Sequence, residues 1–196
     1  MVKFVVGAVA VVVLFIGMLL GASGGGSTAA AACGAGAGDT AAVTKDLPKK
    51  VGTWDTDQVK MAARLVAAAH EVKANEQATT IVVMTAMGES SLTNLNHGDA
   101  VDNTTIGVLQ QDDSYGERAD RLNPEKAAKA FLAKLVKVPD WETLEPTLAA
   151  HKVQVNADPY HYAKFWTDAQ QMVAAVTGAA TTSGCDVSGD QVELAK

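Results

Sequence analysis

The sequence has few charged residues at its start, few cysteines and no excess of positive charge. Only Lys3 and Asp39 carry a charge within the first 40 of its 196 residues. The formal net charge is -6, so no basic face is expected to neutralise phosphate groups, and the partners should not include nucleic acid. Cys33 and Cys185 lack the spacing of a zinc site or a disulfide framework, which argues against both scaffolds.

Aromatic residues are also scarce, at 5% of the chain, and their distribution is uneven. Eight of the ten lie from Trp54 to Trp166, whereas nine of the 17 glycines lie in the first 40 residues. Material for an apolar core is therefore concentrated in one part of the chain. We predict one folded domain over residues 51–177, a length that suits a single hydrophobic core.

The N-terminus contains the one long apolar run, which is uncharged from Phe4 to Ala22. At about 1.5 Å per residue, a helix of this length nearly spans a hydrocarbon core of roughly 30 Å. Residues 1–22 are predicted to form an apolar helix that serves as a signal anchor or a signal peptide. The domain would then be extracytoplasmic, either anchored in the membrane through residues 4–22 or secreted.

The segments on either side of the predicted domain have small and polar side chains that bury little apolar surface. Residues 23–50 are rich in Gly, Ala, Ser and Thr and are predicted to be a flexible linker. Residues 178–196 are predicted to be a tail or a further linker.

Capping signals and apolar spacing predict a mainly α fold. A capping box begins at Asp55, and Asn123 followed by Pro124 is typical of a helix start. Helices are predicted over about 56–73, 78–93, 123–136, 146–153 and 158–172. Strand content is expected to be at most a short hairpin around residues 98–110.

A polar stretch from Leu92 to Asn123 separates the second and third predicted helices. Loops of this length in compact domains are usually functional or disordered. An apolar island at Ile106–Leu109 would anchor this stretch to the core, which favours a functional loop.

Glu89 is the first candidate for chemistry, because it ends an apolar helix beside this loop. A carboxyl group half buried among apolar neighbours has a raised pKa, which suits a general acid. Gln110 and Gln111 follow the apolar island, where their amides could bind the hydroxyl and acetamido groups of a sugar. The structural alternative is an exposed glutamate at a helix end and two surface glutamines.

Several short motifs occur in an order that resembles the lysozyme-like lytic transglycosylases, and most closely their exported actinobacterial-type members and related phage proteins. The resemblance covers about residues 51–172. Its motifs are Glu89-Ser90-Ser91-Leu92, Gly98-Asp99, Gly107-Val108-Leu109-Gln110-Gln111, Asn123-Pro124-Glu125, Val138-Pro139-Asp140-Trp141, His151-Lys152-Val153-Gln154 and Pro159-Tyr160-His161-Tyr162.

The resemblance implies a lysozyme-like helical domain that cleaves peptidoglycan glycan strands between N-acetylmuramic acid and N-acetylglucosamine. Glu89 would be the catalytic acid and base, with Ser90 positioning it and Gln110 contacting the substrate. Tyr160 or Tyr162 would line the groove. The reaction implied needs no metal ion and no organic cofactor.

Two alternatives to this reading follow from the acidic residues of the loop. A hydrolytic muramidase usually needs a second carboxylate, for which Asp99 and Asp113 are the main candidates, with Asp102 and Asp112 beside them. Asp112 and Asp113 also depart from the family pattern and would repel an anionic polymer. This departure favours a non-catalytic component on the same fold that binds the wall or envelope assembly proteins.

Overall fold

The computed structural model describes residues 41–98 and 104–179, and this part of the chain is mainly helical. It contains six α-helices and two short 3₁₀ helices, with isolated β-bridges and no strand among the described residues. In chain order the elements are α1 (Thr56–Glu71), α2 (Glu76–Ser90), η1 (Asp113–Tyr115), α3 (Arg118–Arg121), α4 (Pro124–Leu135), α5 (Pro146–Gln154), η2 (Ala163–Phe165) and α6 (Trp166–Thr177).

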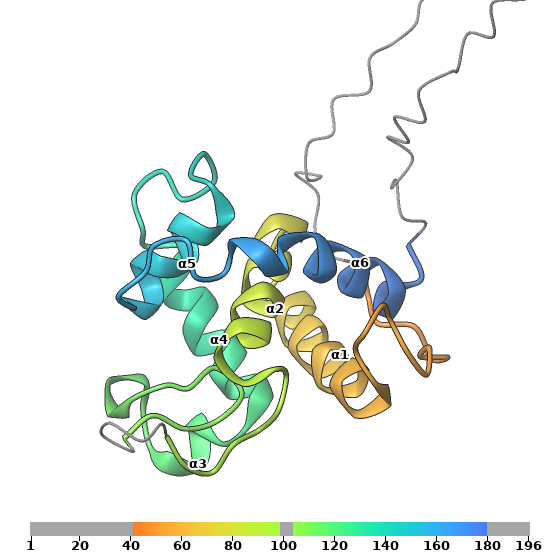
Figure 1. Ribbon diagram of the computed structural model, residues 1–196, viewed down its shortest axis with the longest axis horizontal. Helices are drawn as coiled ribbons and strands as arrows, with labels where there is room; N and C mark the ends of the chain where they lie inside the picture. The colour runs from red at the N-terminus through yellow and green to blue at the C-terminus, as the bar shows by residue number, and fades with distance from the viewer. Residues whose placement is uncertain (1–40, 99–103, 180–196) are drawn as a thin grey trace, which may run out of the picture. The chain divides into compact units, whose positions relative to one another are not determined.

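Helix α2 is the centre of the fold. Figure 1 shows it between α1 and α6 on one side and α4 and α5 on the other, and it contacts all four. Its residues from Ala78 to Met87 are all buried, as expected for a helix that is apolar on every side. Its buried threonines are satisfied internally, since the hydroxyl of Thr85 donates to the Ile81 carbonyl at 2.7 Å.

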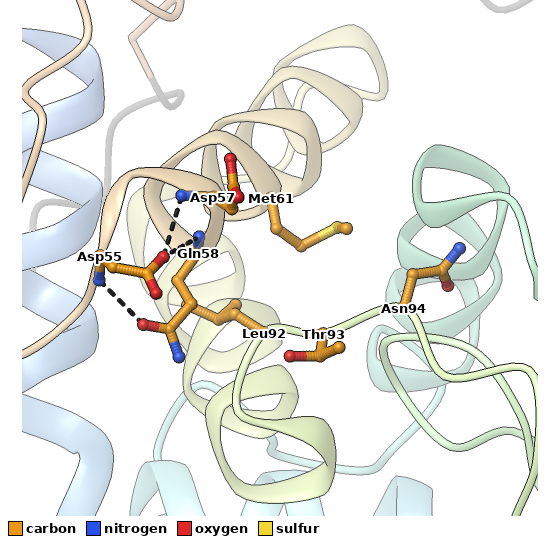
Figure 2. A pocket seen from close by; sticks show the side chains of 7 residues that line it. All are labelled: Asp55, Asp57, Gln58, Met61, Leu92, Thr93 and Asn94. Atoms are coloured by element: carbon orange, nitrogen blue, oxygen red, sulfur yellow. Dashed lines mark hydrogen bonds between the residues drawn. The ribbon is translucent and has the colours of Figure 1, made fainter.

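The predicted start of α1 is confirmed by its capping geometry. The Asp55 carboxylate accepts from the backbone N–H groups of Asp57 and Gln58 at 2.9 and 3.1 Å, and the Gln58 side chain accepts from the Asp55 N–H (Figure 2). The Gln58 amide also donates to the Ser91 carbonyl at 2.9 Å. The first turn of α1 is therefore bonded to the chain immediately after α2.

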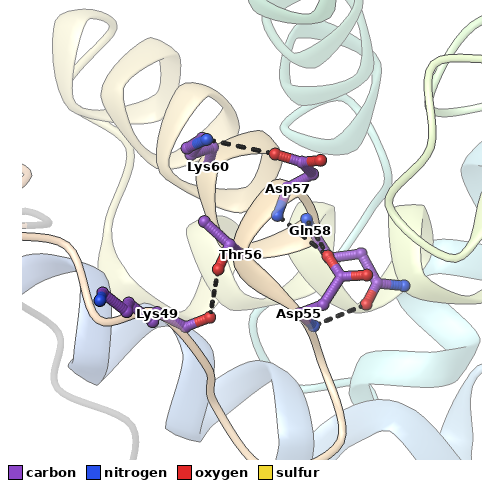
Figure 3. Close-up of polar contacts among 6 residues, drawn as sticks. All are labelled: Lys49, Asp55, Thr56, Asp57, Gln58 and Lys60. Atoms are coloured by element: carbon purple, nitrogen blue, oxygen red, sulfur yellow. Dashed lines mark hydrogen bonds and ion pairs between the residues drawn. The ribbon is translucent and has the colours of Figure 1, made fainter.

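Replacing Asp55 with alanine is expected to lower the free energy of unfolding by about 1 kcal/mol, the usual effect of losing an N-cap side chain. Chemical denaturation would measure it. Asp57→Ala is the matched control, because the Asp57 side chain is 91% exposed and forms an exposed ion pair with Lys60 (Figure 3). Equal losses in the two variants would contradict a specific capping role for Asp55.

The folded part begins before residue 51, earlier than the sequence predicted. Val43 and Leu47 pack against the core, and the Thr44 N–H donates to the Val176 carbonyl of α6 at 2.8 Å. The Thr56 hydroxyl donates to the Lys49 carbonyl at 2.7 Å, which joins this segment to α1 (Figure 3). Residues 43–50 are thus part of the domain and not of the linker.

The last predicted helix begins later than expected. The segment after Asp158 forms a turn, because its carboxylate accepts from the Tyr160 N–H at 2.9 Å and the Thr147 hydroxyl bonds the Pro159 carbonyl at 3.0 Å. The 3₁₀ helix η2 follows, and α6 begins only at Trp166. Of the hairpin predicted around residues 98–110, residues 99–103 are not described, and the described part on either side forms the bridges Leu95–Gly107 and Ile106–Gln111.

Three predicted segments lie wholly or mostly outside the described residues. They are the apolar N-terminal segment 1–22, most of the linker 23–50 and most of the tail 178–196. Within the described ranges, no helix is both long enough and apolar enough to cross a membrane.

Candidate active site

Glu89 lies in the last turn of α2, half buried, where the central helix reaches the polar loop. The hydroxyl of Tyr162 donates to its Oε1 atom, and Tyr162 itself is fully buried. Gly88 makes this contact sterically possible, because a Cβ atom at that position would lie 2.6 Å from Cδ1 of the Tyr162 ring. The pair Gly88-Glu89 therefore provides both the space for a buried tyrosine and the carboxylate that it bonds.

Burial raises the pKa of Glu89 above its ordinary value. The hydrogen bond from Tyr162, the amide of Gln154 and the charge of His161 oppose this effect but do not cancel it. Burial and the nearby charge of Glu89 raise the pKa of Tyr162 in turn, so the phenol keeps its proton. The arrangement is a carboxyl group with increased proton affinity beside a permanent hydrogen-bond donor.

The loop beside Glu89 is fixed to α2 by Ser90. The Ser90 hydroxyl donates to the Val108 carbonyl at 2.7 Å, within the buried apolar island Ile106–Leu109. The Gly107 φ angle is +82°, and a Cβ atom there would lie 2.2 Å from the Arg121 carbonyl oxygen. Ser90 thus positions the loop relative to Glu89 and does not bond the carboxylate itself.

The two glutamines have different environments. Gln110 is half buried, and its amide donates to the Gly107 carbonyl at 2.9 Å. Gln111 is only 1% exposed, and its amide donates to the Ala127 carbonyl of α4 at 3.0 Å. The side chain of Gln111 therefore joins the loop to α4 and does not line the surface near Glu89.

The two tyrosines proposed to line a groove also differ. Tyr160 is 57% exposed, whereas Tyr162 is buried against Glu89. Of the two, Tyr160 is the one exposed at the surface, while Tyr162 is buried and donates a hydrogen bond to the Glu89 carboxyl group.

The candidates for a second carboxylate are not paired with Glu89 by any described contact. Asp99 lies outside the described residues, and Asp113 is an exposed residue that begins η1. Asp112 caps η1 by accepting from the Ser114 N–H at 2.9 Å. A hydrogen bond with the Ser114 side chain is the main cause that lowers the pKa of Asp112, and the bond from the Ser114 N–H and the charges of Lys134 and Arg121 act in the same direction, so this carboxylate stays ionised at neutral pH.

Three residues around Glu89 were not assigned by the sequence: Tyr115, Gln154 and His161. The His161 ring packs edge-on against Tyr162, with centroids 4.9 Å apart. The hydroxyl of Tyr115 bonds Gln154, and burial raises the pKa of Tyr115 to about 12. Gln154 and His161 belong to motifs of the family resemblance, which was the only sequence signal for them.

Two surface hollows lie away from Glu89. One, of about 230 Å³, adjoins the capping box and is lined by residues such as Met61 and Leu92 (Figure 2). The other, of about 470 Å³, lies between α4 and the start of α2, against Trp141. In the part of the chain that the structure describes, no three His, Cys, Asp or Glu side chains gather to hold a metal ion.

No protein-family model and no curated protein matches this chain. The geometry around Glu89 and the sequence motifs that surround it are the features of this chain that bear on its function.

Proposed function

We propose that this protein is a lytic transglycosylase with a lysozyme-like fold, which cleaves peptidoglycan between N-acetylmuramic acid and N-acetylglucosamine. The observation that carries the proposal is the half-buried Glu89 carboxyl, bonded by a buried tyrosine at the end of the central helix. Its raised pKa favours the protonated form that a general acid needs.

In the proposed reaction Glu89 acts twice. As an acid it gives its proton to the glycosidic oxygen, and the bond from that oxygen to the muramic acid C1 breaks. The resulting carboxylate then accepts the proton of the muramic acid C6 hydroxyl as the C6 oxygen bonds C1. The products are a 1,6-anhydro end and a free N-acetylglucosamine hydroxyl, and the Glu89 proton is restored.

The residues around Glu89 would divide the remaining tasks. Tyr162 would hold the carboxyl group in place, and Ser90 would keep the loop beside it. We propose Gln110 and Tyr160 as substrate contacts. Gln110 is half buried in the loop, and Tyr160 is exposed two residues before Tyr162, which bonds Glu89. Peptidoglycan lies outside the cytoplasm, which accords with an apolar N-terminal segment that directs export.

Product analysis tests this proposal. Peptidoglycan is incubated with a chain that starts at Gly34, after the apolar segment, or with its Glu89→Gln variant, and the released fragments are identified by mass spectrometry. Anhydro-ended muropeptides from the parent alone are the expected result. Reducing-ended products would instead identify a hydrolytic muramidase, for which Asp113→Asn would be the next variant.

A second candidate, a non-catalytic protein that binds the cell wall or envelope assembly proteins, is favoured by one observation. Asp112 is ionised and Asp113 is exposed at the start of η1, where their charges would repel an anionic polymer. The charge of Glu89 contributes to the raised pKa of Tyr115 in the same 3₁₀ helix. Release of no fragment by the parent, combined with its sedimentation with peptidoglycan, would support this candidate.

A further inference from the structure

A chain of hydrogen bonds connects η1 and α5 to the site of Glu89. The Tyr115 hydroxyl is 3.0 Å from the Val153 carbonyl and 3.1 Å from Oε1 of Gln154, and its single proton is shared between these two acceptors. The Tyr115 ring is held by a cation–π contact, because Nζ of Lys134 lies 3.2 Å from the ring centroid. The position of this hydroxyl is thus determined by groups from α4, α5 and η1.

The Gln154 amide has its orientation fixed at both ends. Oε1 accepts from Tyr115, and Nε2 donates to the Leu109 carbonyl at 2.8 Å. A primary amide has two N–H groups, so one remains after the bond to Leu109. The Leu109 carbonyl that Gln154 bonds lies one residue after Val108, whose carbonyl accepts from the hydroxyl of Ser90 at 2.7 Å, so Gln154 is placed next to the end of α2 that carries Glu89. In this position the Gln154 amide favours the charged form of the Glu89 carboxyl.

We propose that Tyr115 and Gln154 are positioning residues for Glu89, in which the Tyr115 hydroxyl fixes the Gln154 amide and this amide holds the Glu89 carboxylate beside Leu109. Glu89 would then be held from two sides, by Tyr162 and by Gln154. The inference rests on the proposed function, since it concerns the acid and base of that same site.

This role has a consequence for the proton on Glu89. A hydrogen bond to the charged form stabilises it, so Gln154 limits the increase in proton affinity that burial causes. The titratable groups that face this site are Tyr115 from η1 and His161 and Tyr162 from the segment before η2. Tyr115 remains neutral with its pKa of about 12, so removing its hydroxyl changes no charge.

Titration of the Glu89 carboxyl carbon by NMR tests the inference without requiring catalysis. The full chain in detergent is labelled with ¹³C-glutamate, and the Glu89 signal is assigned by its loss in Glu89→Gln. Gln154→Met is expected to increase the proton affinity of Glu89 about tenfold, the effect of losing one hydrogen bond to a charged group. Tyr115→Phe should shift it in the same direction by a smaller amount.

The double variant and a control decide how Tyr115 acts. If Tyr115 acts through Gln154, adding Tyr115→Phe to Gln154→Met should cause no further shift. Gln77→Met is the control and should leave Glu89 unchanged, because it also removes an amide bonded to a backbone carbonyl, at Glu142. An unchanged Glu89 titration in Gln154→Met, or fully additive shifts, would overturn the inference.

The test remains informative under two kinds of failure. If Gln154→Met does not fold, Tyr115→Phe alone decides, since it keeps the ring and the Lys134 contact and an unshifted titration would overturn the role of Tyr115. If the protein releases no muropeptides, the proposed function fails while the NMR titration still reports on the contacts of Glu89.

Discussion

Replacing Glu89 with glutamine is expected to lower the rate of glycan release by about 10²–10⁴-fold, the usual contribution of a general acid and base. Glutamine has nearly the same shape as glutamate but has no proton to give to the glycosidic oxygen. Initial rates of soluble fragment release from peptidoglycan would measure the loss. Glu142→Gln is the control and should retain most of the activity, because Glu142 is exposed and lines the hollow between α4 and the start of α2, away from Glu89.

The same variant should be more stable than the parent at neutral pH. Because burial raises the pKa of Glu89 in the folded state, the folded protein binds this proton more tightly than the unfolded chain does. The contribution of the protonated Glu89 to the free energy of unfolding is complete below the pKa of this group in the unfolded chain. It is lost as the pH rises through the pKa of Glu89 in the folded protein. Glu89→Gln removes this loss, so its melting temperature should exceed that of the parent at pH 7 but not at pH 4. A lower melting temperature at both values would contradict the burial argument.

Gly107→Ala is expected to lower the free energy of unfolding by about 3 kcal/mol, which combines steric overlap with an unfavourable backbone conformation. The added Cβ would lie 2.2 Å from the carbonyl oxygen of Arg121, a backbone atom that cannot rotate away, and the φ angle is +82°. Urea denaturation would measure the loss. Activity should fall as well, since the displaced loop would no longer meet Ser90 through Val108.

Gly52→Ala separates the two causes in that prediction. Gly52 also has a positive φ angle, of +55°, but a Cβ atom there would meet nothing within 4 Å. Gly52→Ala should therefore lower the free energy of unfolding only through its unfavourable backbone conformation, by about 1 kcal/mol. Similar losses at Gly52 and Gly107 would show that the contact with Arg121 relaxes at little cost.

The helices that begin with strong local signals were predicted well from the sequence. Asp55 and Asn123 accept hydrogen bonds from the first turns of α1 and α4, as expected of N-cap side chains. The end of α2 was placed about three residues late, because Ser91 and Leu92 adopt positive φ angles of 52° and 57°. Such angles are uncommon for residues other than glycine, and the sequence at Ser91 and Leu92 contains no signal that predicts them.

Sequence neighbours and motif resemblance predicted members of the candidate site, Glu89 and Tyr162 among them, but not the contact between these two side chains. Glu89 could be chosen because it follows an apolar helix and precedes a polar loop. Its partner Tyr162 lies 73 positions away, and the Tyr115–Gln154 contact joins residues 39 positions apart. Helical packing brings these side chains together, and periodicity along one segment carries no information about which distant segment will face it.

The start of α6 shows how a local signal can be overridden. Asp158 followed by Pro159 is a typical helix start, yet the hydrogen bond from Thr147 holds Pro159 in a turn against α5. The turn places His161 and Tyr162 next to α2, where a helix begun at Pro159 would have given these side chains another direction.

The hydrogen bond between Thr44 and Val176 has a consequence for how this domain can be combined with others. It brings the chain that enters the domain alongside the chain that leaves it. When the chain enters and leaves a domain at adjacent points, the domain can be inserted into a surface loop of a host protein without moving the two ends of that loop apart. For the same reason, a short peptide could join the two ends, and new termini could be opened elsewhere on the surface while the helical core keeps its connections.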